Sequence, residues 1–269
     1  MQTNKKYERL KSLISNTGSV AVAYSGGVDS TLLLKVAHDV LGDSVIALTA
    51  ISPSFPAHER ERAKEIANQI GVRQVYIESR ELEDERYAAN SPQRCYFCKK
   101  AIIAKLIAFA REQGYDYVIE GTNADDIGNH RPGWQAIQEC EIRSPLQEVG
   151  LTKSEIRSLA KQLDLPNWNS PAAACLASRI SYGTTITPQI LAQVEKGETI
   201  LRQMGFKRLR VRHHGAIARI EIPPHEFSKL LTNNIAIVSK FKEIGYTYIT
   251  LDLAGLRSGS MNEVINNGH

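Results

Sequence analysis

The feature that most constrains the fold is the segment SGGVDS at residues 25–30, which directly follows the apolar run VAVAY. A short apolar run that ends in a glycine pair predicts a buried strand, and the segment STLLLKVAHDVLG after it has helical periodicity. Glycines at a strand-to-helix junction leave backbone N–H groups at the helix N-terminus open to a ligand, and such a concavity binds phosphate. The segment therefore predicts a pyrophosphate cradle in an α/β protein.

Each residue type in this segment has an expected role. Gly26 and Gly27 allow unusual dihedral angles and a close approach, while Ser25 and Ser30 offer hydroxyl donors. Asp29 beside a phosphate is favourable mainly where Mg²⁺ bridges the two anions, so Mg²⁺ is expected there. A plain turn capped by Ser25 or Asp29 is the alternative. The pattern is neither GxGxxG nor a Walker A motif, which argues against dinucleotide binding and γ-phosphate transfer.

The arrangement of apolar runs predicts two domains. Strand-like runs at 20–24, 45–50, 72–79 and 115–121 alternate with helical periods, which predicts an α/β fold with a doubly wound parallel sheet. The first domain is expected to span residues 1–165, and Thr152 and Glu155 are expected to form a capping box at the start of its last helix. Residues 166–186 are rich in Pro, Ser, Gly and Ala, which predicts a linker or working loop. A helix, two strands, a helix at 225–245 and a last strand predict a smaller C-terminal α+β domain at 187–269.

Composition and charge exclude few functions. The 269 residues are 42% hydrophobic and 23% charged, which is typical of a globular protein. The N-terminal segment has no apolar core of a signal peptide, and no run of 18 apolar residues occurs. We therefore expect a cytoplasmic protein with no membrane partner. A formal charge of +4 is too small to indicate nucleic acid over a small anionic substrate.

The four cysteines do not suggest a disulfide framework. Cys95 and Cys98 form a CxxC pair in the loop predicted between the strand at 72–79 and the next helix. The pair could hold zinc, act as a redox pair or ligate an iron–sulfur cluster. Zinc would usually need four ligands, and neither a second CxxC nor a nearby HxxxH supplies them. Cys175 lies in an Ala-rich loop ahead of Arg179, and an accessible thiolate near a cation is reactive. Cys140 is expected to be an ordinary packed thiol.

Several motifs resemble a known superfamily. SGGVDS resembles the signature of the PP-loop ATP pyrophosphatases, which have an adenine nucleotide hydrolase-like fold, and EGTNADD at 120–126 resembles their second shared loop. The stretches CLASRISYGTT, LRVRHHGAIARIEIP and YITLDLAGLRSGSMN are similar to one of its families, LarE, the sulfur transferases of nickel-pincer cofactor assembly. The resemblance implies that residues 1–165 bind ATP and that residues 187–269 bind the substrate and form a homo-oligomer.

The resemblance also implies a reaction. In the LarE family, ATP adenylates a carboxylate of pyridinium-3,5-biscarboxylic acid mononucleotide, and sulfur then displaces AMP to give a thiocarboxylate. Some members give up the sulfur of one cysteine, matching Cys175, and retain dehydroalanine. Others have three cysteines, matching Cys95, Cys98 and Cys175, and hold a 4Fe–4S cluster whose free iron binds sulfide from an external source. The CxxC favours the cluster here, with Cys175 as the alternative donor.

The proposed substrate carries a phosphate and two carboxylates, so it needs cations. Arg210 and Arg212 are two positions apart on a predicted strand, so their side chains share a face. Together they offer a phosphate two planar guanidinium groups, each able to donate paired hydrogen bonds. A solvated strand face is the alternative. The resemblance adds Arg179 and Arg257 to the substrate site.

Other residues have weaker signals. Glu198 and Glu221 match family positions linked to metal or substrate. His213 and His214 are expected at the surface, and Trp168 is expected to be a packing anchor.

Two further functions stay open from sequence alone. A tRNA thiolase of the PP-loop superfamily can also carry three cysteines, but a broad basic surface or zinc knuckles would be expected, and neither is evident. A nucleotide-binding module with structural zinc is the alternative outside enzymes.

Overall fold

The computed structural model describes residues 2–126, 132–140, 142–171, 174–257 and 259–263. The chain forms two compact units. The first consists of Met1–Asp84 and Gln93–Ala173, and the second of Glu85–Pro92 and Ala174–His269. No helix in the described ranges has both the length and the apolar character needed to cross a membrane.

The first unit is built on a parallel sheet, which over the described residues has the strand order β3-β2-β1-β4. Val20 of β1 lies opposite Val45 of β2 on one side and Tyr117 of β4 on the other. The strands are β1 (Val20–Ala23), β2 (Val45–Ile51), β3 (Gln74–Glu78) and β4 (Tyr117–Ile119). The predicted α/β fold with a parallel sheet is confirmed.

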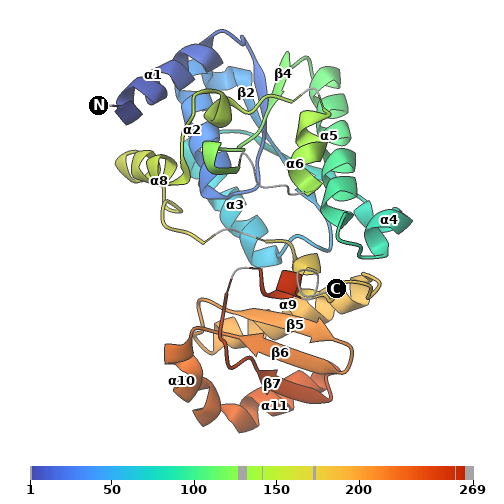
Figure 1. The fold of residues 1–269 in the computed structure, drawn as a ribbon. Coiled ribbons are helices and arrows are strands. Elements are labelled where there is room, and N and C mark those ends of the chain that lie inside the picture. The colour runs from blue at the N-terminus through green and yellow to red at the C-terminus, as the bar shows by residue number, and fades with distance from the viewer. Residues whose placement is uncertain (1, 127–131, 141, 172–173, 258, 264–269) are drawn as a thin grey trace. The chain divides into compact units, whose positions relative to one another are not determined.

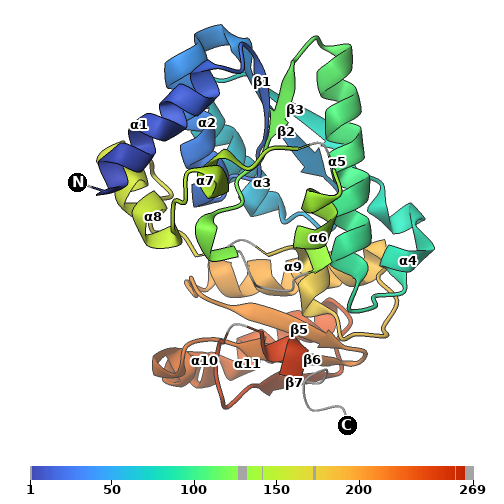
Figure 2. The same cartoon turned by 45° about the horizontal axis from the view of Figure 1, so that its top comes forward.

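Helices cover both faces of this sheet (Figures 1 and 2). Alternate residues of β1 separate the two cores: Val20 and Val22 pack with one set of helices, and Ala21 packs with the other. The helices on the Val20 face are α1 (Gln2–Ser15), α2 (Val28–Leu41), α3 (Ala57–Ile70) and α8 (Lys153–Gln162). The helix on the opposite face is α5 (Arg94–Glu112), through Leu106 and Ala110. This two-sided covering is the doubly wound arrangement that the sequence predicts.

The strand order reverses next to β1. The chain passes from β1 to β2 and β3 in one direction and later returns to place β4 on the other side of β1. Ligands of open α/β sheets bind outside the carboxyl ends of the strands at such a switch point. The loops that follow β1 and β4 therefore meet where a ligand is expected.

The CxxC pair lies in a helix and not in the loop that the sequence pattern predicted. Helix α5 begins at Arg94, so Cys95 and Cys98 are in its first turns. The helix was expected to begin only at Lys99, after the pair. In the structure Gln93 is the N-cap residue and makes no side-chain cap bond. A spacing of three residues on a helix places both thiols on one face.

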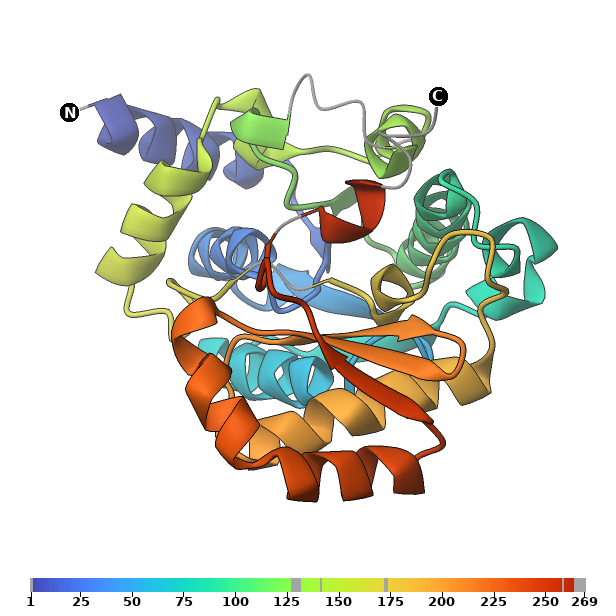
Figure 3. The same ribbon diagram turned by 60° about the horizontal axis from the view of Figure 1, so that its bottom comes forward.

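The second unit contains an α+β fold around a smaller sheet. In the described part of this unit, β5 (Arg210–His214) pairs antiparallel with β6 (Ile217–Glu221), and β6 pairs parallel with β7 (Tyr248–Leu251). Figure 3 shows α9 (Pro188–Gln203) and α11 (Asn234–Glu243), in orange shades, on one side of these strands.

The predicted single helix at 225–245 is two helices in the structure. Helix α10 (Phe227–Thr232) ends before Asn233, and α11 begins directly after it. The Asn233 side chain donates to the Lys229 carbonyl at 2.8 Å, a bond typical of a side chain that competes with the helical backbone.

A short segment of the N-terminal half belongs to the second unit. Helix α4 (Glu85–Ala88) and the residues after it bond to the loop that precedes α9. The Ile186 N–H donates to the Ala88 carbonyl at 2.8 Å, and the Asn90 side-chain amide donates to the Ser181 carbonyl at 2.7 Å. Nothing in the sequence pattern separates this segment from its neighbours.

Candidate functional site

The loop between β1 and α2 needs glycine at Gly26. Gly26 has φ +75°, and a Cβ there would lie 2.6 Å from Ala63 Cβ on α3. Gly27 is the N-cap residue of α2 and makes no side-chain cap bond. A bulkier residue at Gly26 would be strained in its backbone and would also clash with α3. The loop therefore presents bare backbone at the N-terminus of α2, as the sequence predicted.

Two serine hydroxyls fix the shape of this loop. Ser30 Oγ donates to the Gly27 carbonyl at 3.1 Å and accepts from the Ser25 N–H at 3.3 Å. The two hydroxyl oxygens are 3.2 Å apart. The pair that was predicted to face phosphate is thus also part of the internal bonding of the turn.

Asn167 supports the loop from a distant part of the chain. Its buried side-chain amide donates to the Gly26 carbonyl at 2.8 Å and to Thr31 Oγ1 at 2.9 Å. These bonds tie the glycine loop to the first turn of α2. Sequence reasoning missed this residue, because no local pattern links positions 141 residues apart.

Asp29 combines an ion pair with an unused oxygen. Its Oδ2 accepts from Lys153 Nζ, whereas its Oδ1 is buried and has no hydrogen-bond partner among the described residues. Burial raises the pKa of Asp29, and the Lys153 ammonium acts in the opposite direction. A buried carboxylate oxygen without a partner fits a hard cation, so this residue suits the Mg²⁺ that the sequence predicted.

The loop after β4 lies against the same helix N-terminus. A Cβ on Gly121 would lie 2.9 Å from the Ser30 backbone nitrogen, so only glycine permits this approach. Glu120 beside it is buried and accepts from the N–H and hydroxyl of Thr122, at 3.0 and 2.9 Å, and from Ser144. Asp125 accepts from the Lys153 N–H at 2.8 Å. The predicted second loop, from Glu120 to Asp126, therefore lies against the glycine loop.

The predicted metal-ligating cysteines belong to different units. Exposed Cys95 and half-buried Cys98 lie on α5 in the first unit, and exposed Cys175 precedes the short helix η4 (Leu176–Arg179) in the second. No group of three or more Cys, His, Asp or Glu placed to hold a metal was found in the described ranges. Two thiols one helical turn apart fit two ligand positions of a cluster. Cys140 is half-buried, and burial raises the pKa of its thiol.

Arg179 organises the residues around Cys175 in the second unit. Its Nη1 donates to the carbonyls of Ala174 and Cys175 at 2.7 and 3.0 Å. Its Nε donates at 2.9 Å to Glu198, which is completely buried on α9 and also pairs with Arg202. Burial alone would raise the pKa of Glu198, but Arg179 and then Arg202 lower it. Arg179 therefore positions the cysteine loop and is itself held by a buried carboxylate.

A second buried carboxylate organises the arginines of the sheet. Glu221 on β6 accepts from Arg212 at 2.8 Å, from Arg219 at 3.2 Å and from the Ser260 hydroxyl at 2.7 Å. Arg257, which the resemblance placed in the substrate site, pairs with Asp252 at 3.1 Å and with Glu263 at 2.7 Å. The bond partners of Glu221 were not predicted, because they come from three separate segments.

Arg210 lacks the close carboxylate partner that Arg179 and Arg212 have among the described residues. It lies two positions from Arg212 on β5 and so on the same face, and it faces Glu221 in register. Among the described residues it has no carboxylate within ion-pair distance, and its Nη1 donates to the Leu209 carbonyl at 2.8 Å. Burial and then the neighbouring Arg179 lower the pKa of Arg210 to about 10. A half-buried guanidinium beside other cations is a favourable place for an anion.

The two histidines of β5 are not surface residues, so that prediction was wrong. His213 is buried, with Nδ1 3.2 Å from the Tyr246 hydroxyl. His214 is half-buried and lies 2.7 Å from Ser181 Oγ. The strand continues to His214, so alternation turns His213 to the core beside Val211. Trp168 packs against the first core and stacks under Lys161, as expected of a packing anchor.

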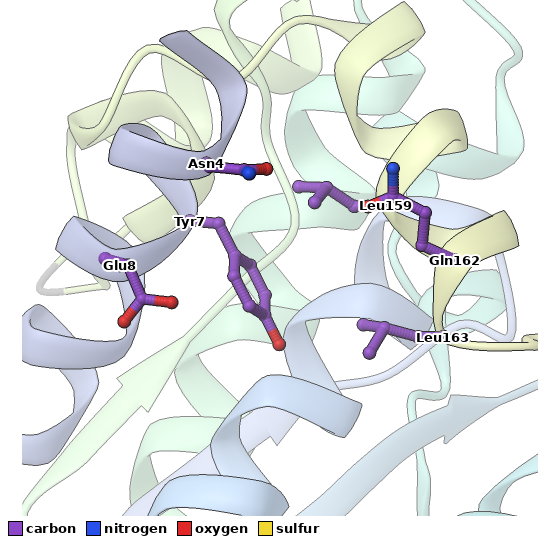
Figure 4. Close-up of a pocket in the computed structure, with 6 residues that line it drawn as sticks. All are labelled: Asn4, Tyr7, Glu8, Leu159, Gln162 and Leu163. Carbon is purple, nitrogen blue, oxygen red and sulfur yellow. The ribbon is translucent and has the colours of Figure 1, made fainter. Parts of the chain in front are cut away.

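A pocket between α1 and α8 is separate from these residues (Figure 4). It contains none of the predicted site residues. Its lining residues are Asn4, Tyr7, Glu8, Leu159, Gln162 and Leu163. The pocket therefore does not serve the chemistry of the glycine loop.

Substituting Glu198→Gln is expected to destabilise the second unit strongly. Arg179 and Arg202 would lose their shared anion, and leaving a buried guanidinium unpaired costs about 3–5 kcal/mol. Denaturant unfolding of the full chain measures the change. Glu243→Gln on the exposed face of α11 is the control, with an expected change under about 0.5 kcal/mol. Equal effects of the two substitutions would contradict the buried-anion role.

Comparisons with known proteins agree with this geometry. The family model described as asparagine synthase matches residues 10–214. The pyridinium-3,5-bisthiocarboxylic acid mononucleotide synthase of Lactiplantibacillus plantarum is 39% identical over 261 residues, which is 97% of this chain and 95% of that protein. This chain belongs to the LarE family. The LarE resemblance, and with it the ATP-using PP-loop domain, is confirmed.

Other relatives place LarE within a wider group. The uncharacterised protein slr1717 of Synechocystis is 42% identical over 262 residues, which is 97% of this chain and 98% of that protein. The argininosuccinate synthase of Haloarcula marismortui is 28% identical over 162 residues, which is 55% of this chain and 38% of that enzyme. The likeness to the LarE relatives thus spans nearly the whole chain, whereas the likeness to this synthase covers little more than half.

Proposed function

We propose that this protein is an ATP-dependent sulfurtransferase that converts a carboxylate of pyridinium-3,5-biscarboxylic acid mononucleotide to a thiocarboxylate. The observation that carries the proposal is the 39% identity, over 97% of the chain, to a synthase whose product name contains the thiocarboxylate. The glycine loop, its two serines and Asp29 supply the matching nucleotide chemistry in the first unit.

The first step uses the glycine loop. The backbone N–H groups at the N-terminus of α2 and the hydroxyls of Ser25 and Ser30 bind the β and γ phosphates of ATP. A substrate carboxylate oxygen attacks the α phosphorus, and the bond to the β-phosphate oxygen breaks to release pyrophosphate. The product is an acyl-adenylate, whose AMP is the leaving group for sulfur. Mg²⁺ would be held by Asp29 and would neutralise the phosphate charge when bound.

The second step needs sulfur. A sulfur nucleophile adds to the acyl carbon, and the carbon–oxygen bond breaks to expel AMP. We propose that Cys95, Cys98 and Cys175 ligate a 4Fe–4S cluster that would hold an external sulfide at its free iron. In the alternative, the Cys175 thiolate attacks directly, and the base-assisted loss of a proton from its α-carbon cleaves the Cβ–S bond to leave dehydroalanine. The pair on one turn of α5 supports the cluster.

The arginines of the second unit are proposed to bind the anionic substrate. Arg210 is the guanidinium best suited to the phosphate, because no carboxylate among the described residues lies within ion-pair distance of it. Arg179, Arg212 and Arg257 are proposed to bind or orient the phosphate and carboxylates from positions that buried and surface carboxylates fix. Binding the substrate through groups away from the reacting carboxylate orients that carboxylate for both steps.

Arg210→Met is expected to weaken substrate binding without destabilising the fold. Arg210 has no close carboxylate and is repelled by Arg179, so its removal should leave the melting temperature unchanged or raise it, while affinity for the mononucleotide should fall at least about tenfold. Calorimetric titration and thermal unfolding measure the two effects. Arg212→Met is the comparison, and it should lower stability by about 2 kcal/mol because Glu221 loses a partner. Equal destabilisation by both variants, with normal binding by Arg210→Met, would contradict this assignment.

Pyrophosphate release in the presence of candidate acceptors tests the function. The dicarboxylate mononucleotide should stimulate release from ATP and yield a thiocarboxylate, whereas unmodified tRNA should not. Stimulation by tRNA alone would identify a tRNA thiolase instead. Protein purified without oxygen should contain iron and acid-labile sulfide at about 4:4, and stoichiometric zinc in their place would overturn the cluster.

We also propose that the protein is a cytoplasmic homo-oligomer. Apolar side chains of the second unit are exposed, among them Ile235 at 85% and Leu253 at 82%, which supports contact with a further chain. Sedimentation at several protein concentrations measures the assembly.

A further inference from the structure

Lys153 is held in place more firmly than a surface lysine. It is the first residue of α8, and its N–H donates to Asp125 Oδ2 at 2.8 Å. Thr152 and Glu155 form the predicted capping box on either side of it, and Glu155 also pairs with Lys6 of α1 at 2.7 Å. The backbone that carries the Lys153 side chain is thus tied both to the loop after β4 and to α1.

The ammonium of Lys153 contacts the one carboxylate of the glycine loop. Nζ pairs with Asp29 Oδ2, and both side chains are largely shielded, at 32% and 21% exposed. A carboxylate shielded from water needs a counter-ion, and Lys153 supplies it. The second oxygen, Oδ1, has no partner in the described part of the chain.

A divalent cation at Asp29 would compete with this lysine. Two cations on the two oxygens of one carboxylate lie close together, and their repulsion in a partly buried site is several-fold stronger than in water. ATP changes the balance, because pyrophosphate oxygens on the adjacent loop offer the ammonium a new anionic partner. Asp29 would then be available to hold the metal, while Lys153 would keep a negative neighbour.

We propose that Lys153 is a positioning residue that occupies Asp29 in the nucleotide-free protein, opposes the binding of a divalent metal there, and releases Asp29 to the metal when ATP arrives. The inference rests on the proposed use of ATP and not on the sulfur chemistry. Metal and nucleotide then bind together, and neither binds tightly alone.

Lys153→Met is expected to shift two affinities in opposite directions. Mn²⁺ binding without nucleotide, measured by electron paramagnetic resonance, should tighten about tenfold because Asp29 loses its competitor. ATP binding with saturating Mg²⁺, measured by calorimetry, should weaken about tenfold because the phosphates lose a cation. Lys153→Gln, which keeps a similar length without charge, should repeat both shifts if the methionine variant folds poorly.

The control is Lys6→Met, which removes another lysine–carboxylate pair at the same end of α8. It should leave both affinities within about twofold. The double variant Lys153→Met with Asp29→Asn should lose the gain in Mn²⁺ affinity. Mn²⁺ affinity that is unchanged or weaker in both Lys153 variants would overturn the inference. The Mn²⁺ and ATP binding measurements involve neither the mononucleotide substrate nor the cysteines. They therefore test the role of Lys153 even if the sulfur-transfer assay fails.

Discussion

Cys175→Ser protein is expected to release pyrophosphate from ATP and the dicarboxylate mononucleotide but to form thiocarboxylate at less than about one-thousandth of the normal yield. A serine hydroxyl neither ligates iron as a thiolate does nor supplies sulfur, so both proposed sulfur routes fail. The residues proposed to bind ATP belong to the glycine loop of the first unit and are unaltered. Mass spectrometry of the product and a pyrophosphate assay separate the two steps.

Cys140→Ser is the matched control, because that thiol is half-buried and outside the proposed set. It should keep both activities within about twofold. Cys95→Ala then distinguishes the routes, since it should abolish repeated turnover if three thiolates hold a cluster. Normal cycling of Cys95→Ala would contradict the cluster, and thiocarboxylate formation by Cys175→Ser would contradict any role of Cys175 in sulfur transfer.

The second large effect is expected at Asp29. Asp29→Asn should lower the rate of acyl-adenylate formation about 10²- to 10³-fold, because the phosphates lose the anion that would hold their metal. ATP-dependent pyrophosphate release with saturating mononucleotide measures the rate. The melting temperature of the variant should be measured alongside the rate, because the substitution also leaves Lys153 without its carboxylate partner.

Asp43→Asn, at an exposed position after α2, controls for loss of one negative charge and should react at the normal rate. An Asp29→Asn protein that folds and adenylates normally would show that the carboxylate is not part of the nucleotide site.

Local signals in the sequence predicted the glycine loop well. The change from an apolar run to a helical period fixed β1 and α2, and the steric need for glycine at Gly26 follows from the close packing of Ala63. The capping box at Thr152 was equally predictable, because both of its bonds lie within four consecutive residues. Features of this kind depend on short-range geometry alone.

The supporting contacts could not be predicted in the same way. Lys153 and Asp29 are 124 residues apart, and no single-sequence pattern links a helix start to a carboxylate at that separation. The helical position of the CxxC was missed because Gln93 gives no cap signal. The burial of His213 was missed because two adjacent polar residues mask the alternation of β5. In each case tertiary packing, and not propensity, decides the outcome.

Residues 85–92 belong to the second unit although the chain on either side of them belongs to the first. The backbone leaves the first unit at Asp84, returns at Gln93 and departs again at Ala173. No single cut therefore yields either unit intact, and a fragment that starts at 174 would lack the Asn90 amide that holds the Ser181 carbonyl. Cys95 and Cys175 each follow one of these crossings within a few residues, so truncations or tags near them would disturb the proposed sulfur ligands before the nucleotide loop.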